Sequence, residues 1–109
     1  MAVAAYSALP YVAWSSATFA EVPAELWEPV YGSMQALKAH VQEYPGCQKF
    51  EAFVEAAPRG SVRVHCYTTW DTPEQLEAYL DRGYTFERLL ADIGAGLDVD
   101  RSLVMEKLF

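Results

Sequence analysis

The residues best suited to chemistry in this chain are a tryptophan and a tyrosine near its middle. Trp70 and Tyr79 are separated by an expected strand-to-helix corner, so both rings can face the gap between sheet and helix. Trp14 and Phe86 can line the same gap. An aromatic gap of this kind suits a flat, apolar or aromatic ligand. The same rings would equally serve to fill a core, and the residues leave both interpretations open.

Acid–base chemistry has few candidates, because the chain holds two histidines. His65 is expected in mid-strand near Glu51 and Tyr67, where a carboxylate could orient it as a base. The alternative, which we favour, is a histidine satisfied within a polar dimer interface. His40 is expected on the surface of a helix.

The cysteines indicate packing rather than reactivity. A thiol at Cys66, between Val64 and Thr68 on one strand face, is typical of an inert core. His65 and Cys66 are adjacent strand residues that point to opposite faces, so they do not form a metal site. Cys47 is expected on the face opposite Cys66, which argues against a disulfide. There is also no phosphate-binding glycine loop, paired-cysteine motif or HExxH, so we expect neither metal nor cofactor.

A β-hairpin around Pro58-Arg59-Gly60 is the clearest structural signal. Proline suits the first central position of a type I turn, and glycine readily adopts positive φ to close the loop. This loop pairs Ala57 with Ser61 and places Glu55 opposite Arg63, a favourable cross-strand pair. One hairpin face is then almost entirely apolar: Phe50, Ala52, Val54, Val62, Val64, Cys66, Thr68 and Trp70.

Two amphipathic helices are expected to cover that face. The first runs from about Pro23 to Tyr44, and Pro29 and Gly32 predict a kink or a late start. Its apolar stripe is Leu26, Val30, Met34, Leu37 and Val41.

The second helix begins at an N-cap, Thr72, with Pro73 at the first helical position and Gln75 completing a capping box. An interruption is expected at Asp81 to Gly83, and Gly94 ends the helix.

Strands at Tyr11 to Phe19 and Leu103 to Phe109 complete the order βαββαβ. This order predicts an α+β, ferredoxin-like fold, with a four-stranded antiparallel sheet and both helices on one face. The end strands carry apolar residues on both faces, from which we expect a homodimer through the sheet faces. The alternative is that the faces of the end strands are simply ambiguous.

Composition predicts a single compact domain over residues 1–109, with residues 1–9 as a short N-terminal extension. Apolar residues make up 52% of the chain, and the formal charge is −7. A nucleic-acid or anionic-membrane partner would need a basic patch, so neither is expected. No apolar run could span a bilayer, and the cytoplasm is the expected compartment.

Two segments give the chain a resemblance to the antibiotic biosynthesis monooxygenase domain family, from roughly Tyr11 to Phe109. One is Tyr44-Pro45-Gly46-Cys47, which opens the second strand. The other is Thr69-Trp70-Asp71-Thr72-Pro73-Glu74-Gln75-Leu76-Glu77-Ala78-Tyr79-Leu80, where the family shows a tryptophan, an acidic turn and an aromatic residue or histidine at the position of Tyr79.

The resemblance implies a dimeric α+β barrel with a pocket between helices and sheet in each subunit. Some members oxidise polycyclic phenols to quinones with O₂ and without metal or flavin. Cys66 stands where that branch carries an asparagine, which departs from its pattern. A haem-degrading branch uses three residues whose positions are occupied here by Ser16, Tyr79 and Leu89, and Leu89 cannot ligate iron.

The resulting hypothesis is a cofactor-free monooxygenase acting on a small aromatic or polycyclic phenol. Trp70 and Tyr79 would hold the ring, Ser16 would bind an oxygen, and Trp14 and Phe86 would shape the walls. The other candidate ligand-binding residues are Cys66 and His65. The alternatives are a non-catalytic ligand-binding or stress-related dimer, and a detoxifying or signalling protein that takes a reactive carbonyl compound.

Overall fold

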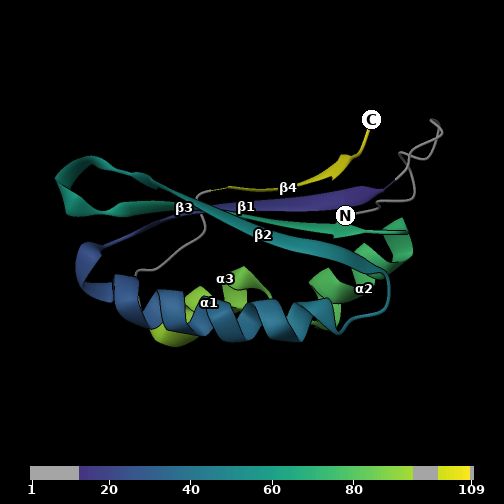
Figure 1. Cartoon of the computed structure of the whole chain (residues 1–109), viewed down its shortest axis with the longest axis horizontal. Helices are drawn as coiled ribbons and strands as arrows, with labels where there is room; N and C mark the ends of the chain where they lie inside the picture. The colour runs from purple at the N-terminus through teal and green to yellow at the C-terminus, as the bar shows by residue number, and fades with distance from the viewer. Residues whose placement is uncertain (1–12, 95–100, 109) are drawn as a thin grey trace.

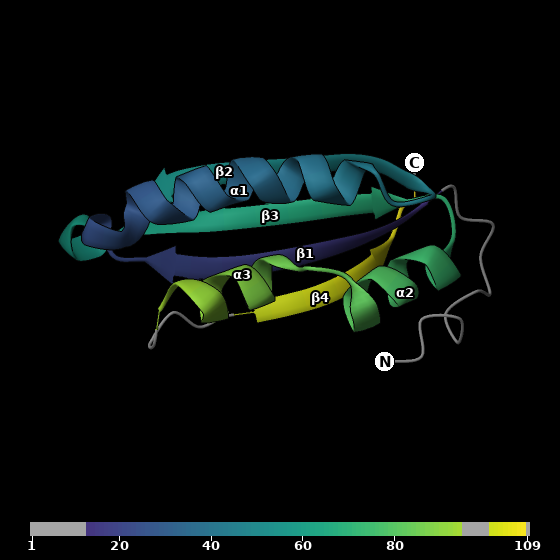
Figure 2. The same ribbon diagram turned by 90° about the horizontal axis from the view of Figure 1, so that it is seen from below.

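The computed structural model describes residues 13–94 and 101–108. In this part of the chain, an antiparallel sheet of four strands in the order β2-β3-β1-β4 carries the three α-helices on one face (Figure 1, Figure 2). The predicted α+β, ferredoxin-like fold is confirmed. The elements are β1 (Trp14–Val22), η2 (Ala24–Leu26), α1 (Trp27–Gln42), β2 (Cys47–Ala56), η3 (Pro58–Gly60), β3 (Val62–Trp70), α2 (Pro73–Arg82), α3 (Phe86–Ile93) and β4 (Arg101–Glu106).

The hairpin register is the one that the sequence predicts. Glu55 lies opposite Arg63, and the Ala57 N–H donates to the Ser61 carbonyl at 3.1 Å. The turn itself differs from the predicted type I, because Arg59 has φ 64° and is followed by Gly60 at φ 75°. Two consecutive residues in the left-handed region thus close the loop, and at Arg59 that conformation is uncommon for a side chain with a Cβ.

A β-bulge between Cys47 and Lys49 changes the start of β2. It places Cys47 opposite Trp70, on the same sheet face as Cys66, so the prediction of opposite faces for the cysteines is wrong. Both cysteines are nevertheless free thiols. Trp70 is four positions beyond Cys66 along β3, roughly 13 Å, which is beyond disulfide reach.

Helix α1 starts later than Pro23, in agreement with the late start that Pro29 and Gly32 predict as one of two alternatives. A short 3₁₀ turn at Ala24–Leu26 precedes it, and the helix begins at Trp27 and ends at Gln42 rather than Tyr44. Pro29 falls in the first turn, where no helical N–H is needed. The residues of α1 that are buried against the sheet are Val30, Met34, Leu37 and Val41.

The second helical segment divides into α2 and α3, as the sequence predicts. The Gln75 N–H donates to the Thr72 hydroxyl at 3.2 Å, so the N-cap is confirmed. The Gln75 side chain does not complete a capping box with residues that the structure describes; it lies over Gly46, where a Cβ would come within 1.8 Å of it. Arg88 joins α3 to the end of α2 by donating to the carbonyls of Gly83 and Asp81, at 2.7 and 3.0 Å.

The end strands are shifted from their predicted bounds. β1 continues to Val22, and the predicted residues Tyr11 and Val12 lie outside the described residues, as does the predicted N-terminal extension. β4 ends at Glu106, short of the predicted Phe109. Within the described ranges, no helix has the length and hydropathy needed to cross a bilayer.

Candidate functional site

A stacked pair of aromatic rings lies between the sheet and α2. Trp70 is the last residue of β3, and Tyr79 lies in the second turn of α2, which follows directly after a capped corner. Their ring centroids are 5.0 Å apart with an interplanar angle of 29°. Tyr44, from the loop after α1, packs edge-on to both rings, at 6.2 Å from Trp70 and 5.5 Å from Tyr79.

A short chain of side-chain hydroxyls continues from this pair into the sheet. The indole N–H of Trp70 donates to Thr68 Oγ1 at 2.8 Å, and that oxygen is also hydrogen-bonded to Ser16 Oγ. Ser16 and Thr68 face each other across the β1–β3 pair. The Tyr79 hydroxyl donates to the Tyr84 carbonyl at 3.1 Å. Each of these buried polar groups therefore has a partner, as the low polarity of the surroundings demands.

Two ionisable groups of this cluster, Cys66 and Tyr79, hold their protons. Burial raises the pKa of the Cys66 thiol to about 12. Burial also raises the pKa of the Tyr79 phenol, with a smaller contribution from the nearby Cys66. Neither group can accept a substrate proton near neutral pH. Within the described residues, no three or more histidine, cysteine or acidic residues gather to hold a metal ion.

The structure brings six of the seven sequence-predicted site residues onto one side of the sheet. All six are buried, and Trp70 and Tyr79 are 0% and 2% exposed. These residues form part of the continuous core, so a ligand reaches the two rings only when neighbouring side chains move. The six residues are Trp14, Ser16, Cys66, Trp70, Tyr79 and Phe86.

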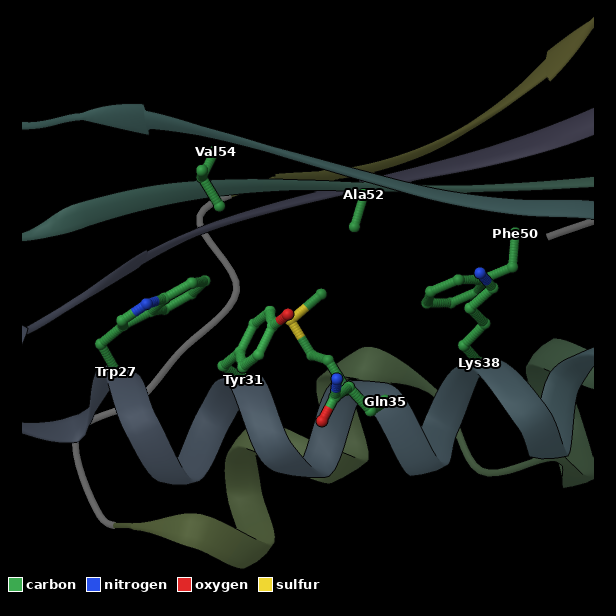
Figure 3. A pocket seen from close by; sticks show the side chains of 8 residues that line it. Trp27, Tyr31, Gln35, Lys38, Phe50, Ala52 and Val54 are labelled. Atoms are coloured by element: carbon green, nitrogen blue, oxygen red, sulfur yellow. The ribbon is translucent and has the colours of Figure 1, made fainter.

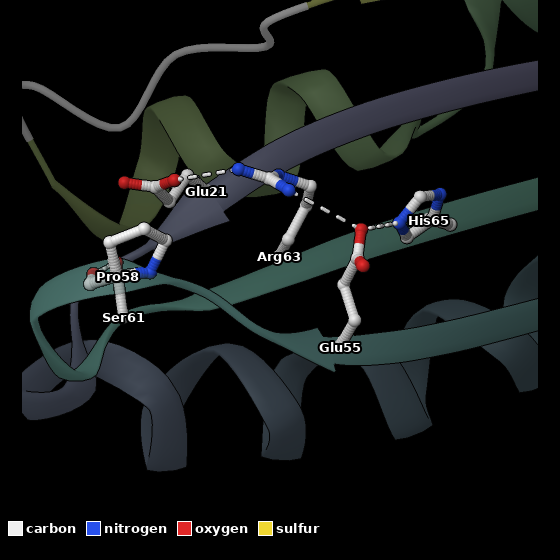
Figure 4. A network of polar contacts seen from close by, with 6 residues as sticks. All are labelled: Glu21, Glu55, Pro58, Ser61, Arg63 and His65. Atoms are coloured by element: carbon white, nitrogen blue, oxygen red, sulfur yellow. Dashed lines mark hydrogen bonds and ion pairs between the residues drawn. The ribbon is translucent and has the colours of Figure 1, made fainter.

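His65 is separated from the other six by the sheet itself. It lies on the open face, where its Nε2 atom is 2.9 Å from Glu55 Oε1 (Figure 4). Arg63 joins that carboxylate to Glu21, with N–O distances of 3.5 and 3.4 Å. The edge of the Phe19 ring packs against the imidazole, with centroids 5.1 Å apart. A carboxylate therefore orients His65, but it belongs to Glu55 and not to the expected Glu51, which pairs with Lys49. From the open face, His65 cannot act on a ligand held at Trp70.

Sequence reasoning did not assign Thr68 or Tyr44 to the site. The hairpin register already placed Thr68 on the face of Trp70, so the pairing of its hydroxyl with the indole N–H could have been anticipated. Tyr44 was noted as part of a motif, but the direction of its ring depends on how the chain leaves α1. Sequence reasoning also missed a groove of about 520 Å³ between α1 and β2 (Figure 3).

Comparisons with known proteins agree on the architecture. No family model matches the sequence, and no curated protein matches it with significant similarity. Solved structures do match. A candidate antibiotic biosynthesis monooxygenase from Nitrosomonas europaea is 14% identical, with a TM-score of 0.71 over 93% of this chain and 95% of that one. A possible oxidoreductase of unknown function from Bacteroides thetaiotaomicron is 18% identical, with a TM-score of 0.68 over 88% and 98%.

A heme-degrading protein from Mycobacterium tuberculosis is also similar, with 18% identity and a TM-score of 0.60 over 89% of this chain and 95% of that chain. At these identities the likeness defines the fold and leaves the reaction open. The chain therefore has the fold of solved structures named as antibiotic biosynthesis monooxygenases, which is the fold that the sequence resemblance implies.

Proposed function

We propose that this protein is a cofactor-independent monooxygenase acting on a small aromatic or polycyclic phenol. The observation that carries the proposal is the Trp70–Tyr79 stack, whose indole N–H begins a chain of hydroxyls. A flat substrate ring would lie against the two aromatic rings, and its oxygen would accept a hydrogen bond from Ser16 or Thr68. The shared fold with proteins named as monooxygenases supports the same class of reaction.

An anthrone-type substrate makes the balance of this reaction explicit. The ionised substrate supplies the electrons that reduce O₂, so the reaction needs no separate electron donor. One oxygen atom becomes the new ketone of the quinone, and the other leaves as water with the two hydrogens lost from the oxidised carbon. Because Cys66 and Tyr79 keep their protons, neither takes up the first substrate proton. The ring would therefore enter the cluster as a neutral molecule and lose this proton to water after binding.

Tyr44 is the proposed entrance to the cluster. Its ring contacts both Trp70 and Tyr79, and the residue also lines a surface hollow with His40 and Pro45. Rotation of this one side chain would connect the hollow to the stacked rings.

The test follows quinone absorbance after the protein is mixed with anthrone in air and under nitrogen. We expect product only in air, above the rate of anthrone oxidation in buffer. Trp70→Phe, which retains a ring but lacks the N–H, should lower the rate, and Lys49→Gln, on the open face of the sheet away from the cluster, should leave it unchanged. A wild-type rate equal to that of buffer would contradict the proposal.

A second function is favoured by one specific observation: Cys66 and Tyr79 both keep their protons, so neither of them can serve as a base. A neutral, aromatic site is suited to hold a flat ligand without transforming it. In that case anthrone would quench tryptophan fluorescence saturably, with no product in air.

We also propose that the open face of the sheet joins a second copy of the chain. Phe19, Phe53 and Tyr67 form an aromatic cluster there, and Phe53 is 56% exposed. An exposed aromatic patch ringed by charged residues is typical of a protein interface.

The two free thiols fit the reducing cytoplasm, where we place the protein.

A further inference from the structure

The helices cover one face of the sheet unevenly. On that face, Val64 of β3 is 0% exposed, whereas its partner in the register, Val54 of β2, is 56% exposed. The next pair shows the same contrast, because Cys66 is buried and Ala52 is exposed. Helix α1 therefore seals β3 but leaves the outer part of β2 open, although that strip is apolar.

Helix α1 supplies an aromatic wall opposite this strip. Trp27 and Tyr31 are one helical turn apart, and their ring centroids lie 5.7 Å from each other. Figure 3 shows both side chains projecting from α1 into the space below β2. Tyr31 is 52% exposed, while Met34 is buried at the base of the wall. The groove between wall and strip measures about 520 Å³, a size usual for pockets that bind small organic molecules.

A lysine supplies the polar group of the groove. Lys38 lies on α1 beside Phe50 at the end away from Trp27 (Figure 3). Lys49 and Arg63 are each paired with a glutamate, but Lys38 makes no ion pair with the residues that the structure describes. In a chain of charge −7, a cation without a carboxylate partner beside an apolar groove favours an anionic group on an apolar ligand.

We propose that the groove between α1 and β2 is a second binding site, which takes a small aromatic organic anion. The rings of the ligand would lie between the Trp27–Tyr31 wall and the Ala52–Val54 strip. Its carboxylate or sulfonate would lie against the Lys38 ammonium. The groove shares no lining residue with the Trp70–Tyr79 pair, so this site stands whether or not the oxygenase proposal does.

The test uses 1-anilinonaphthalene-8-sulfonate, an aromatic anion whose fluorescence rises when it leaves water. We expect saturable binding of one molecule per chain. Ala52→Trp fills the groove and should weaken binding more than tenfold. Lys38→Gln should weaken it roughly fivefold, an effect that high salt should reduce. The neutral analogue N-phenyl-1-naphthylamine should bind the wild type and Lys38→Gln equally.

Two matched variants control for nonspecific binding. Ala39→Trp adds the same ring at an exposed alanine outside the groove, and Lys49→Gln removes a lysine from the other face of the sheet; both should bind the sulfonate as the wild type does. Undiminished binding to Ala52→Trp with native circular dichroism would overturn the site. Equal binding to Lys38→Gln would overturn its preference for anions. If a second copy filled the groove instead, sulfonate binding would weaken as protein concentration rises.

Discussion

The two faces of β3 differ in how their polar side-chain atoms find partners. On the helix-covered face, the strand residues are sealed, and their polar atoms bond to each other as neutral groups. On the open face, Arg63 instead forms ion pairs with Glu21 and Glu55 across the surface of the sheet. The covered residues are Val64, Cys66, Thr68 and Trp70, and the open ones are Arg63, His65 and Tyr67.

This difference determines what each face can bind. A buried charge without a partner is costly, so the covered face suits a flat and largely neutral molecule. The open face combines half-exposed rings with paired charges, the composition of a protein contact surface. The proposed ligand site and the proposed dimer interface therefore lie on opposite sides of one strand.

Truncating one aromatic residue on each face should give the largest difference in stability between the two faces. Trp70→Ala removes a fully buried indole, and we expect a loss of about 3–5 kcal/mol in the free energy of unfolding, read from urea titration. Phe53→Ala removes a ring that is already half in water, so the loss for the single chain should stay below about 1 kcal/mol.

Sedimentation velocity on the same Phe53→Ala variant tests the proposed dimer. If a second copy covers the open face, the wild type should sediment as a dimer, and the variant should dissociate at a higher protein concentration. A wild type that remains monomeric at hundreds of micromolar would contradict the interface. Equal destabilisation by Trp70→Ala and Phe53→Ala in the monomer would contradict the contrast between faces.

The hairpin register could be predicted because a slip of one residue would move every apolar side chain of the strand to the other face. The N-cap at Thr72 and the break near Gly83 were equally predictable, since their causes lie in a few adjacent residues. The left-handed Arg59 could not be read from its residue type, because that conformation follows from how the two strands meet. The bulge at Cys47 depends likewise on the packing of the Tyr44 to Gly46 loop.

The residues of the candidate site could be predicted from the sequence, but the presence and position of a cavity could not. Alternation along the hairpin placed Cys66 and Trp70 on one face and His65 on the other, whereas Ser16 was suggested by the family resemblance. Whether rings leave a cavity depends on how closely they stack, which no pattern states. The groove beside β2 was missed because the pattern marks Ala52 as facing the helices, whereas α1 is positioned over the neighbouring strand.

Two threonines test the comparison at the level of single hydroxyls. Thr68 bonds Trp70 and Ser16 within the covered core, whereas Thr69 on the other face bonds Ser15 at 3.1 Å. Thr68→Val leaves two buried partners unsatisfied and should cost about 1–3 kcal/mol. Thr69→Val disturbs one partly buried pair, so the cost should be smaller. Urea midpoints measure both losses of stability. An equal loss for the two variants would contradict a larger contribution from the buried hydroxyl chain.

The smallest expected effect concerns the charge network of the open face. The hydrogen bond from His65, and then the bond and charge of Arg63, hold the pKa of the Glu55 carboxyl below its usual 4.5. A carboxyl whose folded pKa is lowered stabilises the fold above pH 4.5, and that contribution disappears as the pH falls through the folded pKa. The wild type should therefore melt slightly higher than Glu55→Gln at pH 6, and the difference should vanish in acid.

His65→Val removes the first of these partners, because valine has no hydrogen-bond donor. It should flatten the same pH dependence, which thermal melts from pH 6 to pH 3 can measure. The carboxyl is exposed, so high salt should reduce the difference as well. A gap between the wild type and Glu55→Gln that widens below pH 4.5 would contradict this assignment. Cys66 and Tyr79 on the covered face should add no pH dependence to the stability between pH 6 and pH 3, because both stay protonated across that range.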